Sequence, residues 1–102
     1  MNTSGSLRKN LKMVQCEYKK LCLKDISQLP QEYKEKIIKI LFEDIPRANA
    51  LVDCRLDITS IKGYPDHYRM RIGKYRVGFV MESDKIKFCR VKSREEIYSV
   101  FP

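Results

Sequence analysis

The chain has 102 residues, and its 21 Lys and Arg residues outnumber its 13 Asp and Glu residues, giving a formal net charge of +8. That length suits one domain with one modest core, and the positive excess favours a polyanionic partner: nucleic acid, an acidic protein or an anionic membrane surface. No apolar run approaches the ~20 residues of a membrane-spanning helix, and no secretory signal is visible, so we expect a cytoplasmic protein.

Residues 1–12 are polar and basic, and we expect them to form a flexible tail before a single domain over residues 13–102. Residues 13–19 predict a first strand. Residues 22–29 predict a short helix whose apolar side chains share one stripe.

Residues 31–45 predict a longer helix, because their apolar side chains recur at helical spacing on one face and charged side chains cover the other. Pro46 is expected to end this helix, since the residue before a proline disfavours helical geometry. The apolar stripe consists of Tyr33, Ile37, Ile38, Leu41, Phe42 and Ile45.

Residues 47–62 show no regular pattern, so we expect an irregular or short helical connection there. Residues 63–66 then predict a turn, because they combine glycine, proline and aspartate. The apolar side chains expected to be buried in the connection are Leu51, Val52, Leu56, Ile58 and Ile61.

Residues 68–81, YRMRIGKYRVGFVM, predict a tight hairpin with a two-residue turn at residues 73–74. Neighbouring side chains of a strand point to opposite faces, so one face is apolar and the other carries Arg69, Arg71 and Arg76. This register places Arg71 directly across from Arg76, and like charges placed opposite each other destabilise a sheet. The pair therefore indicates an anionic ligand, and the forked guanidinium favours phosphate. The alternative is that these cations only keep an exposed sheet face soluble.

Residues 85–91 predict the last strand, from which Lys85 and Lys87 extend the cationic face. Residues 94–101 form either a short terminal helix or an extended tail. The order of elements gives an α+β fold, in which an N-terminal strand and a helical hairpin pack on one face of a mainly antiparallel four-stranded sheet. The other face stays partly open.

The four cysteines, Cys16, Cys22, Cys54 and Cys89, include no C-x-x-C pair, and the chain has one histidine, His67. A zinc site needs clustered sulfur and imidazole ligands. We therefore expect reduced, partly buried thiols, no metal and no cofactor.

Two further side chains can carry chemistry. His67 is either a general acid or base or a surface histidine beside a turn. Tyr98 either exchanges a proton or stacks on a base, or it anchors the chain end to the core. No Ser-His-Asp set, glycine-rich phosphate loop or paired-carboxylate site stands out.

Three segments in about the last 40 residues, 61–63 (IKG), 68–77 (YRMRIGKYRV) and 94–98 (REEIY), resemble the RelE/ParE superfamily of bacterial toxins in order and spacing. The family pattern is an lkG turn, yRlRvGdYRv on a central hairpin and R-x-x-(I/V)-Y near the end. The resemblance implies the RelE-like fold. In the RelE branch it also implies a toxin of a type II toxin–antitoxin system, held inactive by a cognate, acidic, RelB-like antitoxin.

Such toxins cleave messenger RNA on the ribosome: the ribose 2′-hydroxyl attacks the adjacent phosphate and the 5′-oxygen leaves. The resemblance therefore implies the ribosome and mRNA as partners, no membrane, and catalysis by in-line positioning and charge stabilisation. It implies that Arg69 and Arg71 form a basic pair and that Arg76 binds the scissile phosphate. Arg94, with Lys92 as the alternative, matches the arginine after the last strand. Tyr98 matches the group that orients or deprotonates the nucleophile. The RNA-binding residues expected around them are Lys92, Lys87, Lys85, Lys74 and His67.

The chain departs from the family at the basic pair, because well-studied members carry lysines where this sequence has Arg69 and Arg71. An arginine stays charged and cannot accept the proton of the nucleophile. The proton acceptor is then Tyr98 or His67, or catalysis is mainly electrostatic.

Two other functions fit the same fold: a ParE-type toxin that inhibits DNA gyrase without nuclease chemistry, and a nucleic-acid-binding module. Arg76, Arg94 and Tyr98 favour the ribonuclease, because a gyrase binder has no need of groups that grip a phosphate.

Overall fold

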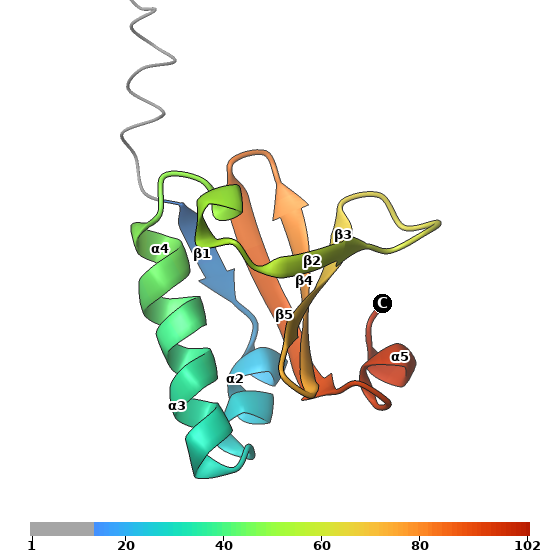
Figure 1. Cartoon of the computed structure of the whole chain (residues 1–102). Coiled ribbons are helices and arrows are strands. Elements are labelled where there is room, and N and C mark those ends of the chain that lie inside the picture. The colour runs from blue at the N-terminus through green and yellow to red at the C-terminus, as the bar shows by residue number, and fades with distance from the viewer. Residues whose placement is uncertain (1–13) are drawn as a thin grey trace, which may run out of the picture.

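The computed structural model describes residues 14–102, which form a five-stranded sheet with helices against both of its faces (Figure 1). The strands lie in the order β1-β5-β4-β3-β2, and all neighbours are antiparallel except β1 and β5. The predicted tail, residues 1–12, lies outside the described residues. The strand bounds are β1 Gln15–Tyr18, β2 Asp57–Ser60, β3 His67–Ile72, β4 Tyr75–Glu82 and β5 Lys85–Ser93.

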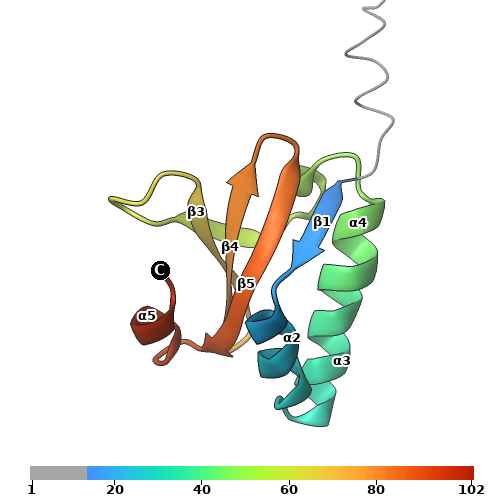
Figure 2. The same ribbon diagram turned by 180° about the vertical axis from the view of Figure 1, so that it is seen from behind.

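Two helices follow β1 in the chain. Helix α2 (Lys20–Ser27) lies beside the part of β5 that extends beyond β1. Helix α3 (Gln31–Lys39) runs antiparallel to α2 along one face of the sheet (Figure 2). Helix α3 continues through a π-helical turn (Ile40–Asp44) into α4 (Ile45–Arg47). Among residues 14–102, every helix is too short or too polar to cross a membrane.

The long helix was predicted to end before Pro46, and this is wrong, because its path continues to Arg47. A proline ring inside a helix removes one hydrogen bond and crowds the carbonyl four residues earlier. Here the turn before Pro46 is π-helical, with the amide of Ile45 donating to the carbonyl of Ile40. This wider turn accommodates the ring without ending the helix.

The main core lies between the helices and the sheet, where Ile37, Leu41 and Ile45 are fully buried. The predicted stripe is narrower in the structure, since Ile38 and Phe42 remain 37% and 39% exposed. The apolar hairpin face packs against these helices as predicted. Its buried members, with those of β5, are Met70, Ile72, Val77, Phe79, Ile86, Phe88 and Val91.

Strand β2 corrects the prediction of a four-stranded sheet. It occupies part of the segment expected to be an irregular or short helical connection, and a 3₁₀ helix (Leu51–Cys54) occupies another part. The strand has only four residues, three of them polar, so no alternating pattern marks it; pairing with β3 defines it. Val52, predicted to be buried, is 79% exposed on the 3₁₀ helix.

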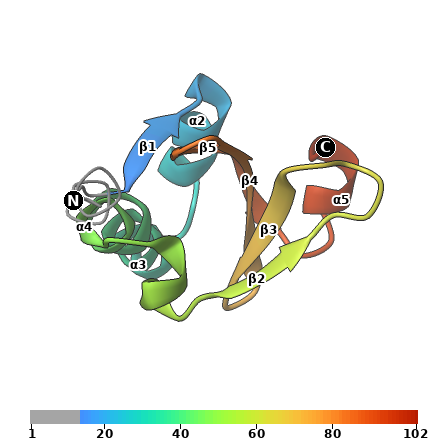
Figure 3. The same cartoon turned by 90° about the horizontal axis from the view of Figure 1, so that it is seen from above.

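The chain end forms helix α5 (Ile97–Val100), which lies on the sheet face opposite α3 (Figure 3). This settles the choice between a helix and an extended tail. A second, smaller cluster anchors α5 to the sheet, with Ile61, Ile97 and Phe101 buried and Val80 and Cys89 packed against them. The face predicted to be partly open is covered by α5 at one end and exposed at the other.

Candidate functional site

The hairpin of β3 and β4 has the predicted register, with Arg71 directly across from Arg76 and Arg69 across from Gly78. Its two-residue turn begins at Gly73, whose φ of +61° is the conformation that such turns require at their first position. The three arginines consequently share the sheet face that the helices α3 and α4 leave uncovered.

A row of four charged side chains crosses this face from strand to strand. Register pairs join Asp57 of β2 to Arg71, Arg71 to Arg76, and Arg76 to Lys92 of β5. Paired residues of neighbouring strands point to the same face, so the row holds one carboxylate followed by three cations.

A first hollow, with a volume of about 270 Å³, opens at the Asp57 end of this row. It brings together four of the five predicted catalytic residues from β3, β4 and α5, and it adds two residues of β2 that were not predicted. Its lining residues are Asp57, Thr59, Arg69, Arg71, Arg76 and Tyr98.

The guanidinium of Arg69 lies under the ring of Tyr98, with its Cζ 4.4 Å from the ring centroid. This cation–π contact holds the ring in place, while Tyr98 stays 63% exposed. The Nε of Arg69 is buried and has no hydrogen-bond partner among the described residues. Tyr98 thus lines the hollow with one ring face covered by Arg69 and much of its side chain exposed.

Arg76 and Arg71 keep most of their donors free. Nη1 of Arg76 donates to the carbonyl oxygens of Gly73 and Tyr75, each at 3.1 Å, which folds the side chain over the turn. Nη1 of Arg71 lies 3.8 Å from Oδ2 of Asp57, a loose contact between two exposed groups. Within residues 14–102, no carboxylate lies within ion-pair distance of Arg69 or Arg76, so an entering anion meets unneutralised charge.

A second hollow, of about 410 Å³, adjoins the first and shares Arg71 and Arg76 with it. Arg94 lies here instead of beside Tyr98, and its backbone amide donates to the carbonyl of Lys74 at 3.1 Å. The only acidic side chain of this lining is Glu95, 3.8 Å from the Arg94 guanidinium. The lining residues are Arg71, Gly73, Lys74, Arg76, Ser93, Arg94 and Glu95.

Four predicted RNA-binding residues lie outside both hollows. Lys92 lies near Asp25 of α2, with its Nζ 3.5 Å from the carboxylate. Lys85 and Lys87 sit at the far end of the sheet and pair with carboxylates of Glu17 and Glu82.

His67 is the fourth, and it also stands apart from the arginines. Its Nδ1 lies 2.8 Å from the carbonyl oxygen of Pro65. Its ring centroid lies 5.9 Å from that of Tyr64 and 5.6 Å from that of Phe101. This placement matches the alternative of a surface histidine beside a turn.

Asp25 is a buried carboxylate that the sequence did not single out. It accepts hydrogen bonds from the backbone amide of Val91 at 3.0 Å and from Nε of Arg90 at 2.8 Å. Burial alone would raise the pKa of this carboxyl, but the bonds from Arg90 and Val91 outweigh burial and lower it. Asp25 thus fastens α2 to the free edge of β5 and removes Lys92 from the row.

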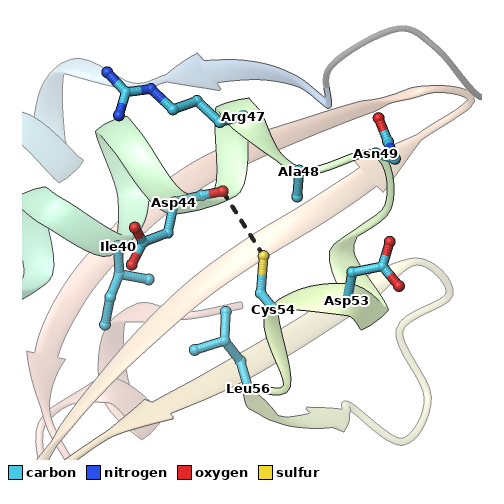
Figure 4. A pocket seen from close by; sticks show the side chains of 8 residues that line it. All are labelled: Ile40, Asp44, Arg47, Ala48, Asn49, Asp53, Cys54 and Leu56. Carbon is cyan, nitrogen blue, oxygen red and sulfur yellow. Dashed lines mark hydrogen bonds between the residues drawn. The ribbon is translucent and has the colours of Figure 1, made fainter.

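A third hollow, of about 510 Å³, lies elsewhere, between α4 and the 3₁₀ helix (Figure 4). It contains none of the predicted site residues. Its charges are partly paired, since Asp44 binds Lys39 and Arg47 lies near Glu43, and the thiol of Cys54 contacts the backbone carbonyl of Asp44 at 3.9 Å. Among residues 14–102, no group of three or more His, Cys, Asp or Glu side chains is placed to hold a metal ion.

Comparison with known proteins gives close relatives. No sequence model of a protein family matches the chain. It is 40% identical over 85 residues to the curated protein Toxin RelE3 of Methanocaldococcus jannaschii. The aligned region covers 83% of this chain and 96% of the relative. A second curated protein of that organism, Putative toxin RelE1, is 38% identical over 81 residues, covering 78% of this chain and 88% of the relative.

Solved structures agree with these relatives. A chain from the RelB–RelE antitoxin–toxin complex of Methanococcus jannaschii superposes with a TM-score of 0.72 at 38% identity, covering 84% of this chain and 99% of that one. A chain from the archaeal RelE–RelB complex of Pyrococcus horikoshii gives a TM-score of 0.59 at 23% identity, covering 82% and 98%. The second likeness concerns the fold alone.

Proposed function

Because this chain belongs to the RelE family of toxins of toxin–antitoxin systems, we propose that it is an endoribonuclease that cleaves messenger RNA on the ribosome. The observation that carries the proposal is the convergence of Arg69, Arg71, Arg76 and Tyr98 around one hollow. Three guanidinium groups without a full set of carboxylate partners form a site for a phosphodiester.

In this proposal the scissile phosphate lies over the cross-strand pair of Arg71 and Arg76. The 2′-oxygen of the preceding ribose attacks phosphorus, the bond from phosphorus to the 5′-oxygen breaks, and a 2′,3′-cyclic phosphate forms. Charge builds on the non-bridging oxygens during this step. Preorganised guanidinium donors stabilise that charge more strongly than they stabilise the ground state.

Tyr98 serves two purposes at this site. Its lower ring face is occupied by Arg69, so its upper face is free for a nucleotide base to stack on it. Its hydroxyl is the candidate donor of the proton that the leaving 5′-oxygen takes. Stacking fixes the nucleotide next to the scissile phosphate in an in-line arrangement.

Arg94 and Lys74 bind the RNA backbone in the second hollow, on the other side of the shared arginines. A strand that crosses both hollows meets cations along its path, as in other grooves that follow single-stranded nucleic acid. Lys92, Lys85 and Lys87 have carboxylate neighbours and contribute less.

A RelB-like antitoxin is the proposed protein partner, because the related RelE chain of Methanococcus jannaschii was solved in a complex with RelB. The net charge of +8 favours an acidic partner that covers this cationic face. Co-expression of such an antitoxin is expected to restore growth of cells in which this chain is induced.

Induction in bacteria without an antitoxin tests the function. Transcript 5′ ends are mapped, with and without a block of translation, and plasmid supercoiling is measured in the same cells. Cuts within translated codons that disappear when translation stops support the proposal. Intact messages with a loss of supercoiling would instead support a gyrase-directed toxin, which the RelE relatives do not favour.

A further inference from the structure

One carboxylate faces the phosphate-binding hollow, where a negative charge weakens affinity for RNA. Asp57 of β2 lines the first hollow together with three arginines and Tyr98. Like charges at close range repel, so an aspartate beside a phosphodiester needs a reason to be there. Neither Arg69 nor Arg71 can accept a proton, and Asp57 is the only carboxylate among the described residues that line the hollow.

We propose that Asp57 is the general base of this ribonuclease, an inference that rests on the proposed function. It occupies the end of the charged row, directly across from Arg71. Neighbouring strands are about 4.8 Å apart. A carboxylate one strand from Arg71 and two strands from Arg76 therefore lies beside a phosphate held between those arginines. The 2′-hydroxyl of the preceding ribose is next to that phosphate.

The proton and the electrons are accounted for at each atom. The carboxylate of Asp57 takes the proton of the 2′-hydroxyl as the 2′-oxygen forms its bond to phosphorus. The 5′-oxygen leaves with the bonding electron pair and takes the proton of the Tyr98 hydroxyl. Water then returns a proton to Tyr98 and removes one from Asp57, so both side chains recover their starting states.

A purely structural role for Asp57 is poorly supported by its contacts. Among residues 14–102 its only ion pair, with Arg71, is 3.8 Å long, and the side chains of Asp57 and Arg71 are 61% and 62% exposed. Exposed pairs of this kind contribute about 0–1 kcal/mol to folding. Asp57→Asn is therefore expected to leave the fold intact, which makes the base assignment testable by substitution.

The test uses the full chain with ribosomes programmed with a message, and it separates kcat from binding. Binding is measured with the same message carrying 2′-O-methyl groups, which block the nucleophile. Asp57→Asn is expected to lower kcat about 100-fold or more. The blocked message should bind this variant as tightly as it binds wild type, or a few-fold more tightly. Asp57→Glu is expected to restore much of the rate. Asp53→Asn, on the 3₁₀ helix Leu51–Cys54, is the matched control and should behave as wild type.

Separate measurements of rate and affinity distinguish the alternatives. Weaker binding with an unchanged kcat would mean that Asp57 only orients Arg71, and it would overturn the inference. Wild-type cleavage by Asp57→Asn would also overturn it and leave the proposed function standing. A wild-type chain that cuts no message under any condition would overturn the proposed function itself.

Discussion

The ring of Phe101 occupies the space that a side chain at Gly78 would need. An ideal Cβ on Gly78 would lie 2.3 Å from Cδ2 of Phe101 and 2.5 Å from its Cγ. The missing side chain in the middle of β4 thus forms a notch into which the chain end packs. Since Phe101 and Ile97 are two of the three buried residues in the cluster that anchors α5, this contact positions Tyr98 over Arg69.

Gly78→Ala is expected to push Phe101 out of its notch and to release Tyr98 from the first hollow. Overpacking of this kind typically costs about 1–3 kcal/mol, and the loss of Tyr98 placement should abolish cleavage. Thermal unfolding and message cleavage are the measurements. Because Phe101 belongs to the small cluster and not to the main core, the variant should still fold.

Phe101→Ala is the partner substitution in a double-mutant cycle with Gly78→Ala. If the notch explains the effect, the double variant should be no less stable than Phe101→Ala alone. Simple additivity of the two destabilisations would contradict the proposed link between these residues.

Arg76→Ala is expected to remove toxicity and to lower cleavage about 100- to 1,000-fold, by analogy with the removal of one charge-stabilising donor. In the part of the chain that the structure describes, its guanidinium donates only to two backbone oxygens of the turn, so stability should change little. Growth of induced cells and single-turnover cleavage are measured beside Lys62→Ala, an exposed cation outside both hollows. A folded and fully toxic Arg76→Ala variant would rule out this phosphate site.

Substitutions of Tyr98 separate its ring from its hydroxyl. Tyr98→Phe keeps the ring over Arg69, so binding of a 2′-O-methyl message should stay within about twofold while cleavage slows about 100-fold. Tyr98→Ala also removes base stacking, and its binding should weaken about tenfold. Equal rates for wild type and Tyr98→Phe would assign the leaving-group proton to solvent.

The paired lysines provide a contrast with Lys74. Lys85→Gln and Lys87→Gln should leave affinity for a short RNA within about twofold, because nearby carboxylates already offset these charges. Lys74→Gln should weaken binding and reduce the slope of log affinity against log salt by about 0.7, the value for one contact to a single strand. Anisotropy titrations over a range of salt concentrations measure both.

Asp25→Asn is expected to destabilise the protein at neutral pH by about 2–4 kcal/mol, because it leaves Arg90 and Lys92 without their buried partner. The pKa of the Asp25 carboxyl is lowered in the folded state, so its stabilisation is fully present above its unfolded value of about 3.9. That stabilisation is lost as pH falls through the lowered folded value. Denaturant unfolding from pH 7 downward should show the difference between wild type and variant shrinking in acid. A difference that stays constant with pH would contradict this account.

Local pattern predicted the elements whose periodicity is strong. The long helix shows its buried face at Ile37, Leu41 and Ile45, and the hairpin shows the pairing of Arg71 with Arg76 through its glycine turn. Strand β2 was missed because four mostly polar residues carry no period, and only the neighbouring strand β3 makes them a strand. Because β2 was not predicted, Asp57, which lies on that strand, was not predicted as a site residue either.

The ion-pair partners of the predicted site lysines could not be inferred from spacing along the chain. Lys92 and Arg76 are cross-strand neighbours, yet Lys92 turns to Asp25, which is distant in sequence. Lys85 and Lys87 lie near Glu17 because β1 pairs in parallel with β5, although the two strands are far apart in the sequence. Long-range ion pairs of this kind appear only when the strands are assembled.

By itself the sequence determined the cationic hairpin face, since alternation and a glycine turn are local properties that any strand pairing must respect. Only the tertiary structure decided which cations stay available to a phosphate, because that depends on carboxylates brought from β1, β2 and α2. It also decided that Tyr98 stands over Arg69, since this placement needs the chain end to pack into the notch at Gly78.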